Sequence, residues 1–156
     1  MTDLVGKKAP DFTVAATGDK SIKLIDLRGQ NVVLYFYPKD ATPGCTTEGQ
    51  CFRDNQKKFD QSETVILGVS RDSLPSHEKF KAREGFDFDL LSDADEKVCA
   101  KYDVVKEKNM YGKKVWGIER STFLIDKSGI VRREWRKVKV AGHVDEVLAA
   151  IKELKL

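Results

Sequence analysis

One buried strand that leads directly into a helix constrains this chain more than any other feature. The run Asn31–Tyr37 (NVVLYFY) is almost wholly apolar, as a strand covered on both faces of a sheet must be. Soon after it, Thr42 and Pro43 have the character of an N-cap and a first helical residue, which places Cys45 at the third helical position. The pattern predicts an α/β fold with helices packed on a sheet.

The rest of the chain repeats this alternation of strand and helix. We expect, in chain order, a hairpin of 11–15 with 21–24, a helix that begins at 43 and continues to about 59, a strand at 65–70, a helix at 76–84, a strand at 88–91, a short helix at 95–102, a hairpin of 121–125 with 130–135, and an amphipathic helix at 144–154. This order predicts a mixed central sheet flanked by helices, with an N-terminal β-hairpin, as one domain over residues 1–156. Reactive groups of such sheets gather at the carboxyl ends of the strands, where Pro38, Thr42 and Cys45 fall.

The composition argues against several classes of function. The chain has 28 basic and 25 acidic side chains, and a net charge of +3 is too small to indicate a nucleic-acid partner. No apolar stretch approaches the ~20 residues that span a bilayer, and the N-terminal MTDLVGKKAPDF lacks the apolar core of a signal peptide. We therefore expect a cytoplasmic protein that acts without a membrane.

The cysteines suggest redox chemistry. Cys45, Cys51 and Cys99 show no C-x-x-C spacing, and a structural disulfide framework is not expected in the cytosol. The free N–H groups and the dipole of a helix N-terminus favour an anion at Cys45, but they contribute only about 0.3 to 2 kcal/mol. A second positive group is required to ionise most of a thiol at neutral pH, and the best candidate is Arg120, which opens an apolar strand and carries a fixed fork of donors.

The spacing P-x-x-x-T-x-x-C, formed by Pro38, Thr42 and Cys45, resembles the active-site signature of peroxiredoxins. The strings YFYPKDATPGCTTEG, GVSRDS and KEKNMYGKKVWGIERSTFLID are similar to the bacterioferritin-comigratory, or Q-type, branch, and the resemblance runs from about Gly6 to the C-terminal helix. It implies a thioredoxin-like fold and a monomeric thiol peroxidase that reduces hydrogen peroxide and organic hydroperoxides in antioxidant defence and redox homeostasis. It also implies recycling by thioredoxin or glutaredoxin, and neither a metal nor an organic cofactor.

The resemblance assigns roles to the residues that match the family pattern. Cys45 is the expected nucleophile, while Thr42, Arg120 and the Cys45 amide polarise the peroxide. We expect the Thr42 hydroxyl to cap the helix as well, and Pro38 to shape and shield the pocket. Glu48, one turn after Cys45, is either a brace for an arginine or a carboxylate on the helix surface.

The thiol that resolves the sulfenic acid of Cys45 is harder to assign. Relatives carry it at the fifth residue after the nucleophile, which is Gln50 here, or in the following helix, where this chain has no cysteine. Cys51 is the sixth residue, and six helical residues advance about 9 Å, beyond the roughly 4.4 to 6.8 Å that a disulfide tolerates between Cα atoms. Cys51 is therefore the provisional resolving cysteine, acting after local unwinding that Gly44 and Gly49 favour.

The other candidate residues have simpler interpretations. Cys99 is expected to pack a helix against the core and is the reserve resolving thiol. His77 and His143 are expected on the surface at helix starts, without a carboxylate or thiol at metal-binding spacing. Two alternative functions remain: a thiol–disulfide oxidoreductase, which the missing C-x-x-C disfavours, and a redox-sensing or chaperone-like binding protein. Steady turnover of peroxide would separate the peroxidase from a sensor that is oxidised once.

Overall fold

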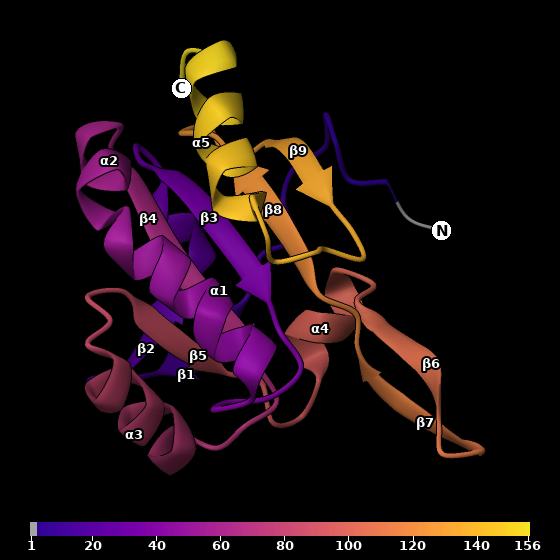
Figure 1. The fold of residues 1–156 in the computed structure, drawn as a ribbon. Helices are drawn as coiled ribbons and strands as arrows, with labels where there is room; N and C mark the ends of the chain where they lie inside the picture. The colour runs from indigo at the N-terminus through magenta and orange to yellow at the C-terminus, as the bar shows by residue number, and fades with distance from the viewer. Residues whose placement is uncertain (1–2) are drawn as a thin grey trace.

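A seven-stranded mixed sheet, in the order β2-β1-β5-β4-β3-β8-β9, forms the centre of the fold in a computed structural model that describes residues 3–156 (Figure 1). The strands are β1 (Thr13–Ala16), β2 (Lys20–Lys23), β3 (Asn31–Phe36), β4 (Thr64–Ser70), β5 (Asp89–Ser92), β6 (Val105–Met110), β7 (Lys113–Ile118), β8 (Ser121–Ile125) and β9 (Val131–Trp135). The helices are α1 (Pro43–Asp54), α2 (Gln56–Gln61), α3 (Leu74–Glu84), α4 (Lys97–Lys101) and α5 (His143–Glu153), with a 3-10 turn at Leu24–Leu27. Within residues 3–156, no helix is long and apolar enough to reach across a lipid bilayer.

The buried strand β3 lies in the middle of the sheet, as its apolar sequence predicts. All six of its residues are buried, and it runs parallel to β4 and antiparallel to β8. The expected hairpins β1–β2 and β8–β9 are present, and β9 forms one edge of the sheet. The prediction of a mixed sheet with an N-terminal hairpin is therefore confirmed.

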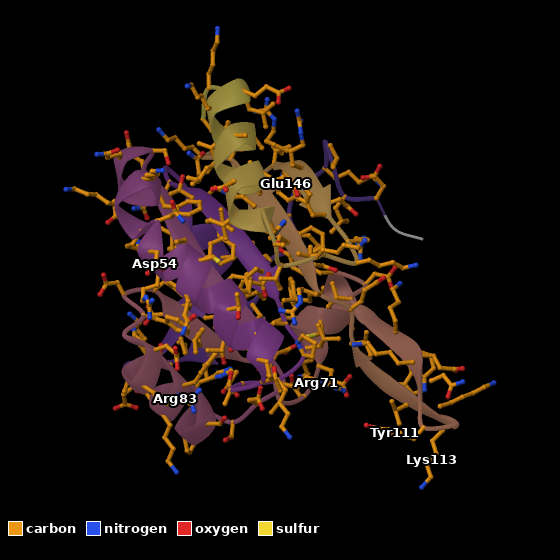
Figure 2. The ribbon with its side chains drawn as sticks, in the orientation of Figure 1. Asp54, Arg71, Arg83, Tyr111, Lys113 and Glu146 are labelled. Atoms are coloured by element: carbon orange, nitrogen blue, oxygen red, sulfur yellow. The ribbon has the colours of Figure 1, made fainter. Side chains whose placement is uncertain are left out.

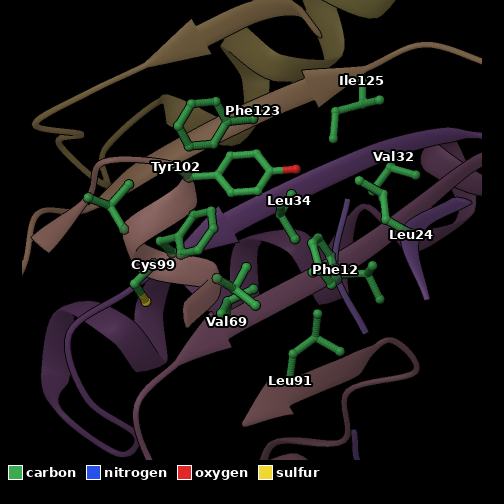
Figure 3. Close-up of a cluster of buried hydrophobic side chains, with 14 of the residues drawn as sticks. Phe12, Leu24, Val32, Leu34, Val69, Leu91, Cys99, Tyr102, Phe123 and Ile125 are labelled. Carbon is green, nitrogen blue, oxygen red and sulfur yellow. The ribbon is translucent and has the colours of Figure 1, made fainter. Parts of the chain in front are cut away.

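The two faces of the sheet carry separate apolar cores. Side chains of β3 alternate between them, with Leu34 and Phe36 on one face and Val33 and Tyr35 on the other. The first face packs against α4 and the N-terminal segment, and Figure 3 shows Cys99 within this cluster. The second face is covered by α1, α2, α3 and α5, and α1 and α5 lie in front of the sheet in Figure 1. A loop of residues 37–42 connects the carboxyl end of β3 to the start of α1 on this second face.

The helix that contains Cys45 ends earlier than the sequence predicts. We expected it to continue to about Phe59, but α1 stops at Asp54 and a separate helix, α2, follows. Asn55 lies between them with φ −108° and ψ 11°, and its side-chain amide donates to the carbonyl oxygen of Cys51 over 2.8 Å. An asparagine side chain that bonds the neighbouring backbone in this way competes with helical hydrogen bonds and separates the two segments.

A second, two-stranded sheet projects from the body of the protein. Strands β6 and β7 pair antiparallel around a two-residue turn at Tyr111 and Gly112, whose φ values are 54° and 79°. Figure 2 shows Tyr111 and Lys113 at its tip, where the Tyr111 side chain is fully exposed. The sequence analysis predicted no element here, because the two strands lack the buried alternation that marks a strand over a core.

Candidate active site

The first turn of α1 has the predicted register and the predicted N-cap residue, but the Thr42 side chain makes no cap hydrogen bond. Thr42 is the N-cap with φ −77° and ψ 154°, Pro43 is the first helical residue, and Cys45 is the third. The Thr42 hydroxyl donates to the carbonyl oxygen of Lys39 over 2.8 Å, so the expectation that it caps the helix is wrong. Since the hydroxyl proton is engaged, the Thr42 oxygen is left to accept a hydrogen bond from another group.

Arg120 reaches Cys45 from the segment between β7 and β8. Its Nη2 donates to Cys45 Sγ over 3.4 Å, and its Nη1 donates to Glu48 Oε1 over 2.6 Å. Burial works against the charge of Arg120, but Glu48 and then Cys45 raise the pKa of the guanidinium. The structure therefore brings together three of the predicted residues, Cys45, Arg120 and Glu48, around one charged group.

A glycine permits the close approach of the guanidinium to α1. A Cβ atom added to Gly44 would lie 3.1 Å from Nη2 of Arg120, which is tighter than ordinary van der Waals contact. Gly49 has a similar role further along the helix, where an added Cβ would lie 2.4 Å from the Phe86 ring. Both glycines, which the sequence analysis connected with unwinding of the helix, thus also have a packing reason.

Glu48 is a buried brace for Arg120. Its side chain is fully buried, which rules out the alternative of a carboxylate on the helix surface. Burial raises the pKa of Glu48 to about 7, and Arg120 works in the opposite direction. Glu48 Oε2 has no hydrogen-bond partner within residues 3–156, so no hydrogen bond to this oxygen stabilises the ionised form of the carboxyl group.

The other predicted residues of the site, Pro38 and Cys51, lie before α1 and within it. Pro38 follows β3 and is half-buried, and Cys45 is only 2% exposed. Cys51 is half-buried on the same helix, where burial, Asp54 and Asp145 raise the pKa of its thiol. An intact α1 holds Cys51 and Cys45 about 9 Å apart along its axis, so the structure does not bring the two sulfurs together.

Cys99 lies in the core on the opposite face of the sheet from Cys45. It is fully buried in α4, and burial together with Asp93 raises the pKa of its thiol. The Asp93 carboxylate accepts from the backbone N–H of Cys99 over 2.7 Å. The prediction that Cys99 packs a helix against the core is confirmed, and the intervening sheet separates it from Cys45.

Both histidines are buried, contrary to the expectation of surface positions. His77 packs in the first turns of α3, and His143 contacts Thr122 Oγ1 through Nε2 over 2.8 Å. Burial and then Arg120 lower the pKa of His143 to about 4. The spacing of His77 to Phe80, three residues apart on one helix face, was the signal that could have indicated a buried histidine.

The projecting sheet adds cations that the sequence analysis did not single out. Lys108 Nζ donates to the carbonyl oxygen of Ile118 over 2.5 Å, and burial, Arg120 and Arg71 lower the pKa of Lys108. Arg71, labelled in Figure 2, donates to the carbonyl oxygen of Trp116 over 3.3 Å. Lys108 also interacts electrostatically with Cys45, so Arg120 is not the sole positive group that acts on this sulfur among the described residues.

Comparison with known proteins agrees with the geometry of the site. The model of the AhpC/TSA family matches residues 5–134. Peroxiredoxin Bcp of Xanthomonas campestris is 56% identical over 142 residues, which cover 91% of this chain and 89% of that protein. Peroxiredoxin Bcp of Bacillus subtilis is 49% identical over 154 residues, with 99% and 98% covered.

A solved structure extends the likeness to the fold. The bacterioferritin comigratory protein of Xanthomonas campestris, described with its alkyl peroxide reduction activity, superposes with a TM-score of 0.87 at 54% identity, covering 91% of this chain and 90% of that one. The thioredoxin-like fold expected from the sequence is thus confirmed. The chain belongs to the AhpC/TSA family, in its Bcp or Q-type peroxiredoxin branch, and is a thiol peroxidase that reduces peroxides through a cysteine.

Proposed function

We propose that Cys45 is the cysteine that attacks the peroxide and that Arg120 keeps it ionised. The observation that carries this assignment is the contact of 3.4 Å between Arg120 Nη2 and Cys45 Sγ at the start of α1. A thiolate, not a thiol, is the nucleophile, and an adjacent guanidinium together with a helix N-terminus favours the anion. Cys51 and Cys99 have thiols whose pKa values are raised, which disfavours either of them as the nucleophile.

The reaction proceeds by displacement at the peroxide. The Cys45 sulfur forms a bond to one oxygen, the O–O bond breaks, and the leaving oxygen takes a proton to become water or an alcohol. Arg120 and the first-turn amides of α1 stabilise the negative charge that develops on the leaving oxygen. Thr42 accepts a hydrogen bond from the attacked peroxide, because its own proton is directed at the Lys39 carbonyl.

Pro38 and Glu48 position the reacting groups and do not react themselves. Pro38 has no N–H and follows β3, so it closes one side of the pocket without competing for the peroxide oxygens. Glu48 fixes the guanidinium plane by its contact of 2.6 Å with Nη1, which leaves Nη2 directed at the sulfur. We assign both as positioning residues for the reaction.

Cys51 resolves the sulfenic acid of Cys45 by forming a disulfide and releasing water. This step requires α1 to unwind between the two residues and to release the packing of Gly49 against Phe86. Mass mapping after one equivalent of peroxide is expected to find a Cys45–Cys51 bond in the wild type and only the sulfenic acid or its adducts in Cys51→Ser. A stable sulfenic acid in the wild type would remove Cys51 from the pathway.

The family implies peroxide substrates and a thiol reductant, and we propose finer identities for both. Hydrogen peroxide and organic hydroperoxides are the substrates, and alkyl peroxide reduction by the Xanthomonas campestris relative supports the second class. Thioredoxin or glutaredoxin reduces the disulfide, the protein works as a monomer, and it acts in the cytoplasm, where thiols are kept reduced between turnovers.

Coupled peroxide consumption tests the proposed function. Wild-type protein with thioredoxin, its reductase and NADPH is expected to turn over hydrogen peroxide many times for each Cys45, and Thr42→Val should lower the second-order rate by about a hundredfold. Oxidation that stops after one equivalent of peroxide in the presence of every reductant tried would favour the sensor over the peroxidase. Sedimentation of the reduced protein measures the oligomeric state.

A further inference from the structure

The loop between Pro38 and Thr42 contains a buried acid that the proposed chemistry does not use. Asp40 is 7% exposed, and its carboxylate accepts from the Tyr37 hydroxyl over 2.7 Å and from the Ser76 hydroxyl over 2.8 Å. Its Oδ2 also lies 2.7 Å from Nδ1 of His77. Burial works in the opposite direction, but the hydrogen bonds from His77 and Tyr37 lower the pKa of Asp40, so the carboxylate is ionised.

His77 faces an acceptor at each of its ring nitrogens. Nε2 lies 2.9 Å from the carbonyl oxygen of Leu91, which accepts only, so this nitrogen carries a proton. Nδ1 lies against a carboxylate oxygen of Asp40. His77 therefore bridges the Leu91 carbonyl and the Asp40 carboxylate inside the protein.

Asp72 adds a second anchor to the same loop. Its Oδ2 accepts from the backbone N–H of Asp40 over 2.9 Å and from the Ser70 hydroxyl over 2.5 Å. Asp72 belongs to the GVSRDS string that the sequence analysis singled out, so this string has a structural task at the site. Asp40, Asp72 and His77 place ligand atoms within 4.8 Å of one another, but the two His77 nitrogens and both Asp40 oxygens already have protein partners. The cluster is therefore an internal hydrogen-bond network.

The anchored acid is followed by a strained residue. Ala41 has φ 64°, in the left-handed region that disfavours residues other than glycine. Such a conformation persists only where its surroundings determine it, and here Asp40 is held on one side while Thr42 is held by Lys39 on the other. The direction of the Thr42 hydroxyl therefore depends on the position of Asp40.

We propose that Asp40 and His77 form a positioning pair for peroxide reduction, which fixes the Thr42 oxygen relative to Cys45 through the left-handed Ala41. The pair touches neither the sulfur nor the peroxide. It connects the first turns of α3 and the end of β5 to the loop before α1. The inference rests on the proposed role of Thr42 and extends it to two residues to which the sequence analysis gave no role in the reaction.

Two reactions of Cys45 separate positioning from a structural effect. Alkylation by iodoacetamide requires only the thiolate, which Arg120 and α1 support, whereas peroxide reduction also requires the Thr42 oxygen. His77→Gln and Asp40→Asn are each expected to slow peroxide reduction by about tenfold or more and to change alkylation by less than about twofold. Lys79→Ala, an exposed change on α3, should alter neither rate and is the matched control.

A double-mutant cycle locates the effect at Thr42. In the Thr42→Val background, His77→Gln should slow peroxide reduction by no more than about twofold further, because the oxygen that the pair positions is already absent.

Several outcomes would overturn the positioning pair. Equal losses of both Cys45 reactions would make the pair purely structural, full peroxide activity in both variants would make it irrelevant, and additive losses with Thr42→Val would place its action elsewhere. If His77→Gln does not fold, the loss of peroxide reduction relative to the loss of Cys45 alkylation is measured in Asp40→Asn instead. Failure of wild-type Cys45 to react with peroxide would instead refute the proposed function, so the two failures are distinguishable.

Discussion

Two buried cysteines occupy the same position of two helices, and their surroundings differ in sign. Cys45 is the third residue of α1, and Cys99 is the third residue of α4. At α1 the Thr42 hydroxyl turns away to Lys39 and a guanidinium lies 3.4 Å from the sulfur. At α4 the Asp93 carboxylate takes the first-turn N–H groups and raises, together with burial, the pKa of the thiol. A position at a helix N-terminus is thus not enough to favour a thiolate. The charge of the neighbouring side chain, Arg120 at Cys45 and Asp93 at Cys99, makes the difference.

The largest expected effect contrasts the two sulfurs directly. Cys45→Ser should lower peroxide reduction by at least about a thousandfold, because it removes the proposed nucleophile. Cys99→Ser should leave the rate within about twofold, since that thiol lies across the sheet from the site. Steady-state peroxide consumption measures both variants, and a comparable loss in Cys99→Ser would break the comparison.

Removal of the Arg120 guanidinium should make the surroundings of Cys45 more like those of Cys99. Arg120→Met is expected to slow peroxide reduction by about a hundredfold to a thousandfold, as loss of a preorganised charge stabiliser does. Arg132→Met, a change on the edge strand β9, is the matched control. Stopped-flow oxidation of reduced protein measures the rate. A rate for Arg120→Met equal to that of the control would show that the contact with Cys45 has no catalytic role.

Glu48, which lies beside Arg120 near Cys45, should make the stability of the protein depend on pH. The folded protein holds the Glu48 proton up to about pH 7, while the ordinary value for the side chain is 4.5. The stabilising contribution of protonation is therefore complete below about pH 4.5 and is lost as pH rises through about 7. Glu48→Gln should reduce the fall in unfolding free energy across this window by up to about 3 kcal/mol.

Urea unfolding of wild type and Glu48→Gln at several pH values measures this difference. Gln61→Glu, on the exposed end of α2, serves as a control for an added or removed surface carboxyl group. Identical slopes in wild type and Glu48→Gln would show that Glu48 ionises as an exposed side chain does.

The smallest effect on peroxide reduction is expected from a change beside Cys99. Asp93→Asn removes the negative charge beside Cys99 and weakens the cap of α4, which should cost about 1 kcal/mol of stability. It should also speed alkylation of Cys99 several-fold and leave peroxide reduction within about twofold. Unchanged alkylation of Cys99 would mean that burial alone controls this thiol.

The sequence predicted the parts of this comparison that depend on local pattern. Apolar runs locate β3 and β4, and Thr42, Pro43 and Cys45 locate the start of α1, because caps and buried strands act over a few residues. The contact of Arg120 with Cys45 joins residues 75 positions apart, so the sequence could name Arg120 only as a candidate, which the family resemblance strengthened.

Other features could not be predicted because they depend on tertiary partners. The Thr42 hydroxyl follows the Lys39 carbonyl, and the burial of His77 depends on Asp40 and Leu91, which come from other segments. Most of β7 is exposed and only its last two residues are buried, so the sequence carries no alternating pattern that marks its pairing with β6. Propensity and periodicity describe one segment at a time and carry no information on which carboxylate a histidine meets.

Parallel alkylation of the two buried cysteines tests the central claim most directly. Reduced protein is treated with iodoacetamide over a range of pH, and the modification of Cys45 and Cys99 is followed by peptide mass analysis in the same sample. The account predicts that Cys45 is modified at least about a hundredfold faster than Cys99 at neutral pH. A Cys45 thiol that is modified no faster than the Cys99 thiol would contradict it.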